Sequence, residues 1–280
     1  MSKKVFLSFL LFFIVAIVLV FTFIDIFESK EEPKVILKEK QISKVYRYRK
    51  YIHVKNFYKD IAQNAVKIGL KYNVPPAALL AIAGVESGYG RGYVAKITGN
   101  ILSLGAKKGE AELPALYLPN PKDDSSKVLY GSMIEKYEKD KLIWKKRPKS
   151  LKKDYRPKSI AGTSKDLDFL DKNPDLKREA NLACMEDFAA YWINRNKKFK
   201  PFVEAREMLD KQVKLHGESI LFDRDTNIQF IYMISGKKNS FNYRETWAPK
   251  VTKIMKNTGL LELTNSLHVE GKTFDELWGS

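Results

Sequence analysis

Glu86 is the acidic side chain with the clearest chemical setting, because it ends an apolar run and precedes Ser-Gly-Tyr-Gly-Arg. Leu79, Ile82 and Glu86 are spaced i, i+3 and i+7, so they share one face of a predicted helix. The carboxyl group then lies on the inward face, in the last turn, where the helix dipole disfavours an anion. Burial and the dipole both raise the pKa of this group, which is what a general acid needs to protonate a glycosidic oxygen.

The glycines after Glu86 bear on access to the carboxyl group. Gly88 and Gly90 allow a sharp turn and leave no side chain over it, so a polymer can approach. From spacing alone, a surface glutamate at a helix end with a glycine stop explains the same pattern.

The elements that must position Glu86 are mostly helical. A stripe from Phe57 to Tyr72 predicts an amphipathic helix that ends near Asn73, and a second helix begins at Pro75-Pro76 and stops at Gly88. We expect further helices from Pro174 through Trp192 after an Asn173 cap, from Pro201 to Gly217, from Ser219 to Ile234, and from Thr246 to Lys256 before a stop at Gly259.

Residues 106–160 differ from the rest, because they combine prolines with little helical periodicity. Residues 136–158 interleave lysines and arginines with Tyr137, Trp144 and Tyr155. We interpret this stretch as an irregular lobe inserted between helices, which is the layout of a two-lobed cleft. Its aromatic and basic side chains would suit a glycan strand with acidic groups, and a solvated basic face is the simpler alternative.

The motif at Glu86-Ser-Gly-Tyr-Gly-Arg resembles the Glu-Ser-Gly-Trp-Gly-Lys/Ser motif of the bacterial glucosaminidase family (glycoside hydrolase family 73, including the Bax-like proteins). Other segments match in order: Val74-Pro-Pro, Ala95, Gly99-Asn100-Ile-Leu102, the helix around Asn181–Trp192, and Asn242-Tyr243…Trp247-Ala-Pro-Lys250-Val251. The resemblance covers roughly residues 51–258. It implies a mainly α, lysozyme-like two-lobed fold with an irregular or small β lobe, and cleavage after N-acetylglucosamine.

The resemblance also implies roles for individual residues. Tyr243 would face Glu86 across the cleft, although a core tyrosine at a helix entrance is the alternative. Tyr89 and Trp247 would contact sugars. Trp144 is a further candidate for sugar binding, on the composition of the lobe rather than on the resemblance. Asn100 would bind the N-acetyl group or orient Glu86, unless it is a turn residue. The sequence departs from the family where Tyr89 replaces tryptophan, where Ser103-Leu104-Gly105 replaces Phe-Gly-Ile, and where Arg244-Glu245-Thr246 replaces the closing aspartate.

Glycosidases usually pair the acid with a second carboxylate, at a separation that sets inversion or retention. The candidates in the lobe are Glu110, Glu112, Asp123, Asp124 and Glu135. We select Asp123 and Asp124, although their Pro-Lys-Asp-Asp-Ser-Ser setting is equally typical of a turn. Without such a partner, the acetamido oxygen of the substrate could attack instead.

Metal and cofactor chemistry has no support in the sequence. His53, His216 and His268 are widely scattered, and the single cysteine, Cys184, lies in an apolar helical pattern. We therefore expect no zinc site and no cofactor, with Cys184 as a core residue. No glycine-rich phosphate loop is present.

The start of the chain indicates where the protein works. Residues 5–24 are almost entirely apolar, and a helix of this length spans about 30 Å, the thickness of the bilayer core. Lys3 and Lys4 precede the run, which holds the N-terminus in the cytoplasm. Because the run is long and lacks a small-residue cleavage site, we predict an uncleaved single-pass anchor (1–28) in the cytoplasmic membrane, with a cleaved signal peptide as the alternative. A charged tether (29–50) and a catalytic domain (51–280) in the periplasm or cell exterior would follow.

The 50 Lys and Arg against 33 Asp and Glu give a net charge of +17, which favours a polyanionic partner. Outside the cytoplasm, that partner is peptidoglycan rather than nucleic acid. We predict a monomeric endo-β-N-acetylglucosaminidase with Glu86 as its acid. A lytic transglycosylase stays open, although its Gly-Leu-Met-Gln motif is missing, and so does a non-catalytic wall-binding scaffold.

Overall fold

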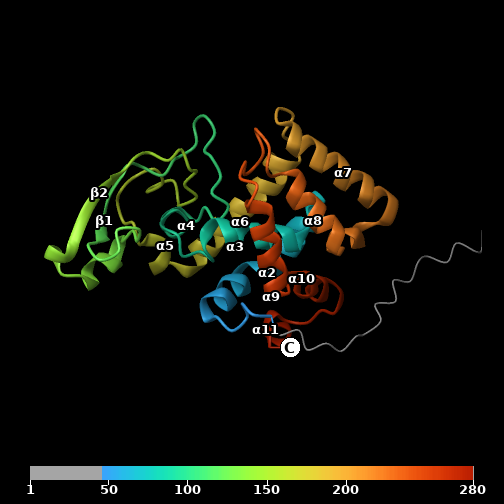
Figure 1. Cartoon of the computed structure of the whole chain (residues 1–280), viewed down its shortest axis with the longest axis horizontal. Coiled ribbons are helices and arrows are strands. Elements are labelled where there is room, and N and C mark those ends of the chain that lie inside the picture. The colour runs from blue at the N-terminus through green and yellow to red at the C-terminus, as the bar shows by residue number, and fades with distance from the viewer. Residues whose placement is uncertain (1–45, 280) are drawn as a thin grey trace, which may run out of the picture. The chain divides into compact units, whose positions relative to one another are not determined.

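The computed structural model describes residues 46–279, and helices dominate this part of the chain (Figure 1). The predicted anchor and most of the predicted tether lie outside the described residues. No helix within 46–279 is long and apolar enough to cross a membrane. The backbone N–H of Tyr48 donates to Asn257, and the guanidinium group of Arg49 donates to Thr258 and Leu277. The folded body therefore begins a few residues before the predicted boundary at residue 51.

The helical segments follow one another along the chain with one hairpin between them. The bounds are α2 (Ile52–Tyr72), α3 (Pro76–Ser87), α4 (Tyr93–Thr98), α5 (Phe169–Lys172), α6 (Pro174–Asp187), the π-helix η3 (Phe188–Ile193), α7 (Lys200–His216), the 3-10 helix η4 (Glu218–Phe222), α8 (Arg224–Met233), α9 (Trp247–Thr258), α10 (Leu260–Val269) and α11 (Phe274–Trp278).

Most predicted helix ends are confirmed. Asn73, Gly88 and Gly259 end α2, α3 and α9 in the left-handed conformation, with φ of 51°, 56° and 67°. The prediction of one helix from Ser219 to Ile234 is wrong, because the chain breaks at Asp223. The Asp223 side chain accepts a hydrogen bond from the backbone N–H of Thr226 at 2.8 Å, so it caps a new helix, α8.

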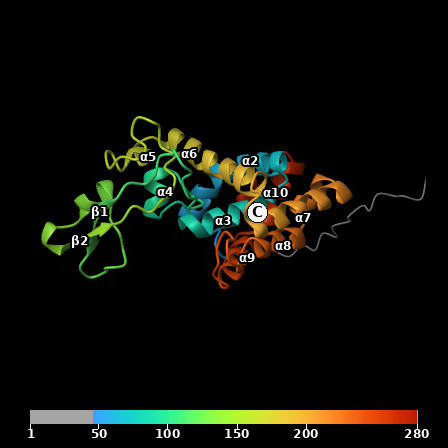
Figure 2. The ribbon, with the colours of Figure 1, turned by 90° about the horizontal axis from the view of Figure 1, so that it is seen from above.

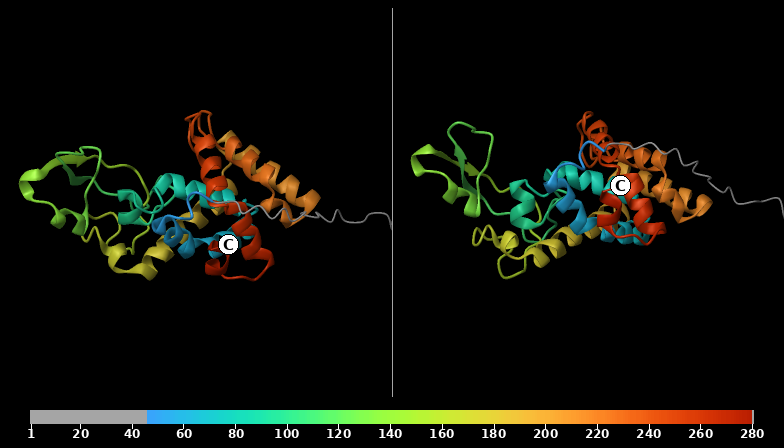
Figure 3. Two further views of the ribbon diagram at one scale, coloured as in Figure 1. Left: turned by 60° about the horizontal axis from the view of Figure 1, so that its bottom comes forward. Right: turned by 90° about the horizontal axis from the view of Figure 1, so that it is seen from below.

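The inserted lobe contains the only sheet among residues 46–279, an antiparallel pair of β1 (Leu116–Pro121) and β2 (Leu142–Arg147). Leu116 pairs with Arg147 and Pro121 with Leu142, and the long connection holds the 3-10 helices η1 (Gly131–Lys136) and η2 (Lys139–Lys141). The expected irregular or small β lobe is confirmed. The hairpin and α7 lie at opposite ends of the folded body in every view (Figures 2 and 3).

Buried apolar side chains form two separate cores. The smaller core joins α4 to the hairpin through Ile97, Leu113, Leu116, Leu118 and Tyr130. The larger core is helical, and α3 lies inside it, in contact with α2, α8, α9 and α10 (Figure 1). Residues 76–84 of α3 are buried without a break. The backbones of α2 and α3 come close at Gly84, where a Cβ atom would lie 2.5 Å from the hydroxyl of Tyr58.

The N-terminal end of α3 is fixed by a buried amide from α8. The Asn227 side-chain oxygen accepts a hydrogen bond from the backbone N–H of Ala78 at 3.0 Å. Its amide nitrogen donates to the carbonyls of Leu221 and Asp223 at 2.9 and 2.7 Å. One side chain therefore ties α3, η4 and α8 together and satisfies a helix N–H that has no partner within α3.

We expect Asn227→Ala to destabilise the protein by about 1–3 kcal/mol, because the N–H of Ala78 would be buried without a partner. The free energy of unfolding is measured by urea denaturation, followed by circular dichroism. Asn265→Ala in α10 is the matched control, since Asn265 forms no side-chain hydrogen bond within the described residues. An equal effect of the two substitutions would contradict this role of Asn227.

Candidate active site

Glu86 lies in the last turn of α3, half-buried, against the first turn of α9. The indole N–H of Trp247 donates to a carboxyl oxygen of Glu86 at 2.7 Å. The side chain of Asn242, just before α9, also interacts with this carboxyl group and lowers its pKa. Two polar groups from the far end of the sequence therefore hold Glu86 in place.

The pKa of Glu86 is raised above its ordinary value of 4.5, as predicted. Burial is the largest cause, because it penalises the charged form. The hydrogen bond from Trp247, the charge of Lys152, the hydrogen bond from Asn242 and the charge of Lys250 all act in the opposite direction, and burial outweighs them. The group therefore holds its proton to a higher pH than an exposed glutamate, with two lysines nearby to favour the anion once the proton leaves.

The turn after Glu86 is left-handed at three successive residues, Gly88, Tyr89 and Gly90, with φ of 56°, 59° and 72°. The Ser87 hydroxyl donates to the carbonyl of Ala83 at 2.6 Å and accepts from the N–H of Gly90 at 2.8 Å. The motif thus builds a tight turn that ends α3 directly beyond the carboxyl group.

Tyr89 is directed toward the helical body by this turn. Its ring packs edge-to-face on Phe57 and Tyr58, with centroids 6.2 and 6.0 Å apart, and on His53 at 5.8 Å. Burial raises the pKa of its hydroxyl to about 12. Its packing explains an aromatic residue at this position without a ligand, and a contact with sugar stays a prediction.

The charge of Lys152, a residue of the lobe, acts on Glu86, and sequence reasoning missed this residue. Its ammonium group donates to the backbone carbonyl of Ser103, and burial lowers its pKa while the charge of Glu86 raises it. The backbone N–H of Ala106 donates to Leu151 at 2.8 Å, next to Lys152. Two lobe segments thus lie side by side where the lobe meets α3.

Asn100 joins these two segments. Its amide nitrogen donates to the carbonyls of Leu104 and Lys153 at 2.8 and 2.9 Å, and its oxygen accepts from the N–H of Leu104 at 2.8 Å. The side chain is 1% exposed, so its amide has no group free for the N-acetyl group of a sugar. Asn100 therefore acts as a turn residue, which was the alternative interpretation. Its hydrogen bond to the carbonyl of Lys153 also helps to position the neighbouring Lys152.

Cys184 of α6 packs against the same amide. Its thiol donates to the oxygen of Asn100 at 3.3 Å. The side chain is fully buried, and burial raises the pKa of the thiol to about 12. The interpretation of Cys184 as a core residue is confirmed.

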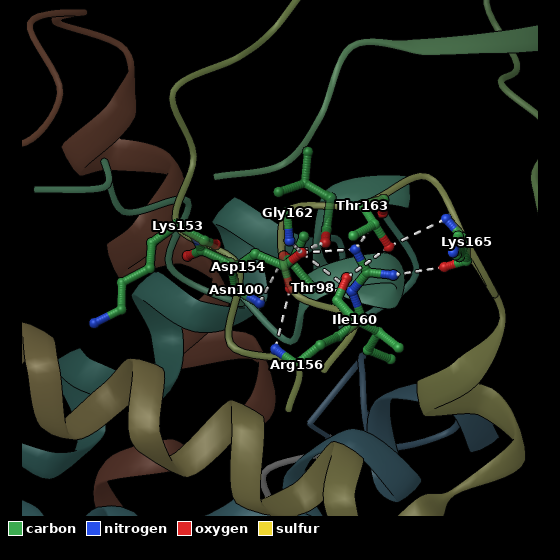
Figure 4. A network of polar contacts seen from close by, with 10 residues as sticks. Thr98, Asn100, Lys153, Asp154, Arg156, Ile160, Gly162, Thr163 and Lys165 are labelled. Atoms are coloured by element: carbon green, nitrogen blue, oxygen red, sulfur yellow. Dashed lines mark hydrogen bonds and ion pairs between the residues drawn. The ribbon is translucent and has the colours of Figure 1, made fainter. Parts of the chain in front are cut away.

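A buried ion pair anchors the segment that follows Lys153. Figure 4 shows the guanidinium group of Arg156 against the carboxylate of Asp154, with a shortest distance of 2.7 Å. Both side chains are fully buried. Arg156 also donates to the carbonyls of Thr163 and Lys165, and Asp154 accepts from the N–H of Gly162. Every charge in the pair thus has hydrogen-bond partners, as burial requires.

The candidate second carboxylates lie in other environments. Glu110 forms an ion pair with Lys153 at 2.8 Å, and Lys153 also binds Asp187. Asp124 accepts from the N–H and hydroxyl of Ser126 at 3.1 and 2.6 Å, so it stabilises a turn. Asp123 is exposed beside it, at the end of the hairpin that lies well apart from α9 (Figure 2). The structure does not bring Asp123 or Asp124 to Glu86.

The remaining candidates are spread over the surface and the core. Trp144 is 44% exposed on the hairpin and stacks on Tyr117, with ring centroids 5.8 Å apart. Tyr243 is 71% exposed and directly follows Asn242, and among the described residues it forms no hydrogen bond to Glu86. Trp247 is 4% exposed, which leaves no ring face for a sugar. Its expected sugar contact is replaced by the hydrogen bond to Glu86.

Metal ligands do not gather at this site or elsewhere in the described residues. No group of three His, Cys, Asp or Glu side chains within 46–279 is arranged to hold a metal ion. The groups that act on the Glu86 carboxyl are an indole N–H, an amide and the charges of two lysines.

We expect Trp247→Phe to raise the pKa of Glu86 further, because the indole N–H stabilises the charged carboxylate. The pKa is measured by carbon-13 NMR of the Glu86 carboxyl group during a pH titration. Trp278→Phe is the matched control, since Trp278 is also buried but its indole donates to the backbone of Arg49. A pKa that is unchanged or lowered by Trp247→Phe would refute this role.

No model of a known protein family matches the sequence, and no curated protein matches it significantly. Among solved structures, the chain is similar to the catalytic domain of the autolysin Auto from Listeria monocytogenes, with 15% sequence identity and a TM-score of 0.41. The match covers 76% of this chain and 88% of the Listeria chain. A likeness at this level assigns the chain to no family.

Proposed function

We propose that this protein cleaves the glycan strands of peptidoglycan after N-acetylglucosamine, with Glu86 as the general acid. The observation that carries the proposal is a half-buried carboxyl group with a raised pKa, at the end of α3 and within a Glu-Ser-Gly-Tyr-Gly-Arg motif. A carboxylic acid that stays protonated delivers its proton to the glycosidic oxygen as the bond to the anomeric carbon breaks.

The surroundings of Glu86 favour the protonated acid before the bond breaks and stabilise the carboxylate afterwards. Burial favours the neutral acid before the bond breaks. Afterwards the carboxylate keeps the hydrogen bond from Trp247 and faces the charges of Lys152 and Lys250, which stabilise the anion. The carboxylate can then take a proton from the attacking group and return to its starting state.

The charged groups that act on Glu86 are lysines, and this favours a route that uses a single carboxylate. In one route the acetamido oxygen of the substrate attacks the anomeric carbon, and water then opens the resulting ring. In the other, a hydroxyl group of the sugar attacks and leaves an anhydro end, as in a lytic transglycosylase. The single-acid setting makes the transglycosylase the second candidate function.

We place this activity outside the cytoplasm as part of the same proposal. The apolar run at residues 5–24 after Lys3 and Lys4 supports a single-pass anchor in the cytoplasmic membrane. The net charge of +17 supports a polyanionic wall as the partner.

Digestion of purified peptidoglycan tests the proposal. The full-length protein is compared with Glu86→Gln, and the products are identified by mass spectrometry. We expect fragments with reducing N-acetylglucosamine ends, and a loss of about 10²–10⁴-fold in rate for Glu86→Gln, since the amide cannot donate the proton. Anhydro-muramic ends would instead establish the transglycosylase. No fragments from either protein would reject catalysis and leave wall binding.

The pH dependence of kcat/KM gives a second test. Activity that needs protonated Glu86 falls as the pH rises through its pKa, so the alkaline limb lies above 4.5. The charge of Lys250 lowers that pKa, so Lys250→Met should move the limb to higher pH. Lys256→Met, farther along α9, is the control and should leave the limb in place. A limb that does not respond to Lys250→Met would exclude Glu86 as the titrating group.

A further inference from the structure

A hollow of about 410 Å³ lies where the lobe meets the end of α6, and Glu86 is not among the residues that line it. One wall comes from Gly105, Ala106 and Lys107. The other comes from the end of η3, with Tyr191 and Trp192, and from the stretch that joins η3 to α7, with Arg195 among its residues. Nothing in the proposed chemistry of Glu86 uses this hollow.

The charge of the hollow is entirely positive. Lys107, Arg195, Lys197 and Lys198 line it, and none of its lining residues is acidic. Within residues 46–279, Arg195, Lys197 and Lys198 form no ion pair, so their charge is available to a ligand. Lys107 lies 3.9 Å from Glu110 and holds its ammonium group 3.3 Å from the ring centre of Tyr191.

Aromatic rings supply the rest of the lining. Tyr191 and Trp192 come from the π-helix η3, a wide helical turn that is frequent at functional sites. The ring of Trp192 packs against Phe202 with centroids 5.9 Å apart, and Tyr191 is 40% exposed. A flat, partly exposed ring beside cations matches a ligand with both a sugar ring and a negative charge.

The wall of the hollow is held in shape by two side-chain amides, those of Asn194 and Asn196. The Asn196 oxygen accepts from the backbone N–H groups of Lys198 and Phe199, both at 3.0 Å, and Asn196 is 8% exposed. The Asn194 amide donates to the carbonyls of Tyr72 and Ala189 at 2.8 and 2.9 Å. The turn that carries the cations is therefore preorganised, which lowers the entropic cost of binding.

The hollow is linked to Glu86 through the backbone of the lobe. Gly105 and Ala106 come two and three residues after Ser103, whose carbonyl accepts from Lys152, and the charge of Lys152 acts on Glu86. The N–H of Ala106 bonds to Leu151, so both sides of this link are fixed. A strand lying along this segment would present different parts to Glu86 and to the hollow.

We infer that the hollow is a binding site for the acidic stem peptide that peptidoglycan carries on its glycan strand. This inference rests on the proposed function and deepens it. The guanidinium group of Arg195 and the ammonium groups of Lys197 and Lys198 pair with the peptide carboxylates, in charge-assisted hydrogen bonds. Tyr191 packs on the sugar that bears the peptide. The enzyme would then select strands that keep their peptides.

Calorimetric titration of the full-length chain tests this inference. The protein carries Glu86→Gln to prevent turnover, and the ligands are a peptide-bearing peptidoglycan tetrasaccharide and the same tetrasaccharide stripped of peptide. We expect Lys197→Ala/Lys198→Ala to weaken binding of the peptide-bearing ligand about tenfold, and further with Arg195→Ala, while binding of the stripped ligand is unchanged. Lys211→Ala/Lys214→Ala removes the same charge from an exposed part of α7 and should change neither affinity.

Other outcomes overturn the inference in distinct ways. An equal loss for both ligands would mean that the cations bind the glycan itself, and no loss for either would mean that the hollow binds neither. Cleavage of stripped strands by the unsubstituted protein tests the proposed function separately. If those strands are cleaved and the lysine variants bind both ligands normally, only the peptide site is rejected.

Discussion

The burial of α3 is the constraint on which the position of Glu86 depends. Residues 76–84 are enclosed by four other helices, so the last turn of α3 is carried to the edge of the core with its carboxyl group half-buried. Removing a carboxylate from water without neutralising it is costly, and the indole N–H of Trp247 reduces that cost. The burial that stabilises α3 therefore also raises the pKa of Glu86. The stability of the helix and the pKa of the acid cannot be changed independently.

The two sides of the site are held by different physical means. The helical side relies on apolar packing and on the amide of Asn227. The lobe side has a small core, and it depends on buried polar contacts, chiefly the Asp154–Arg156 pair and Asn100. Such polar networks specify one geometry because any other arrangement leaves a charge or an amide without partners. The charge of Lys152 thus acts on Glu86 from a segment whose position is fixed by hydrogen bonds rather than by hydrophobic area.

Local signals made much of the fold predictable. The ends of α3 are predicted by the prolines and the glycine that flank it in the sequence. The apolar spacing within it predicts that Glu86 lies on an inward face. Contacts across the chain have no such signal. Trp247 and Glu86 are 161 residues apart, and an aromatic residue at a helix start looks the same whether it faces a ligand or a carboxyl group. Lys152 lies in a run of lysines and arginines, so the sequence alone does not distinguish it from its basic neighbours. Apolar periodicity predicted one continuous helix from Ser219 to Ile234. The side chain of Asp223 caps α8 instead, so a new helix begins there.

The chemical reactivity of Cys184 reports on motion of the loop that carries Asn100. Only the thiolate reacts readily with alkylating reagents, and a fully buried thiol with a pKa near 12 supplies almost none at neutral pH. The hydrogen bond from this thiol to Asn100 crosses from α6 to the loop that carries the lobe side of the site. Labelling of Cys184 therefore requires that loop to separate from α6. The rate of modification of a single natural cysteine would thus measure how often the two sides of the site part, and whether a bound strand holds them together.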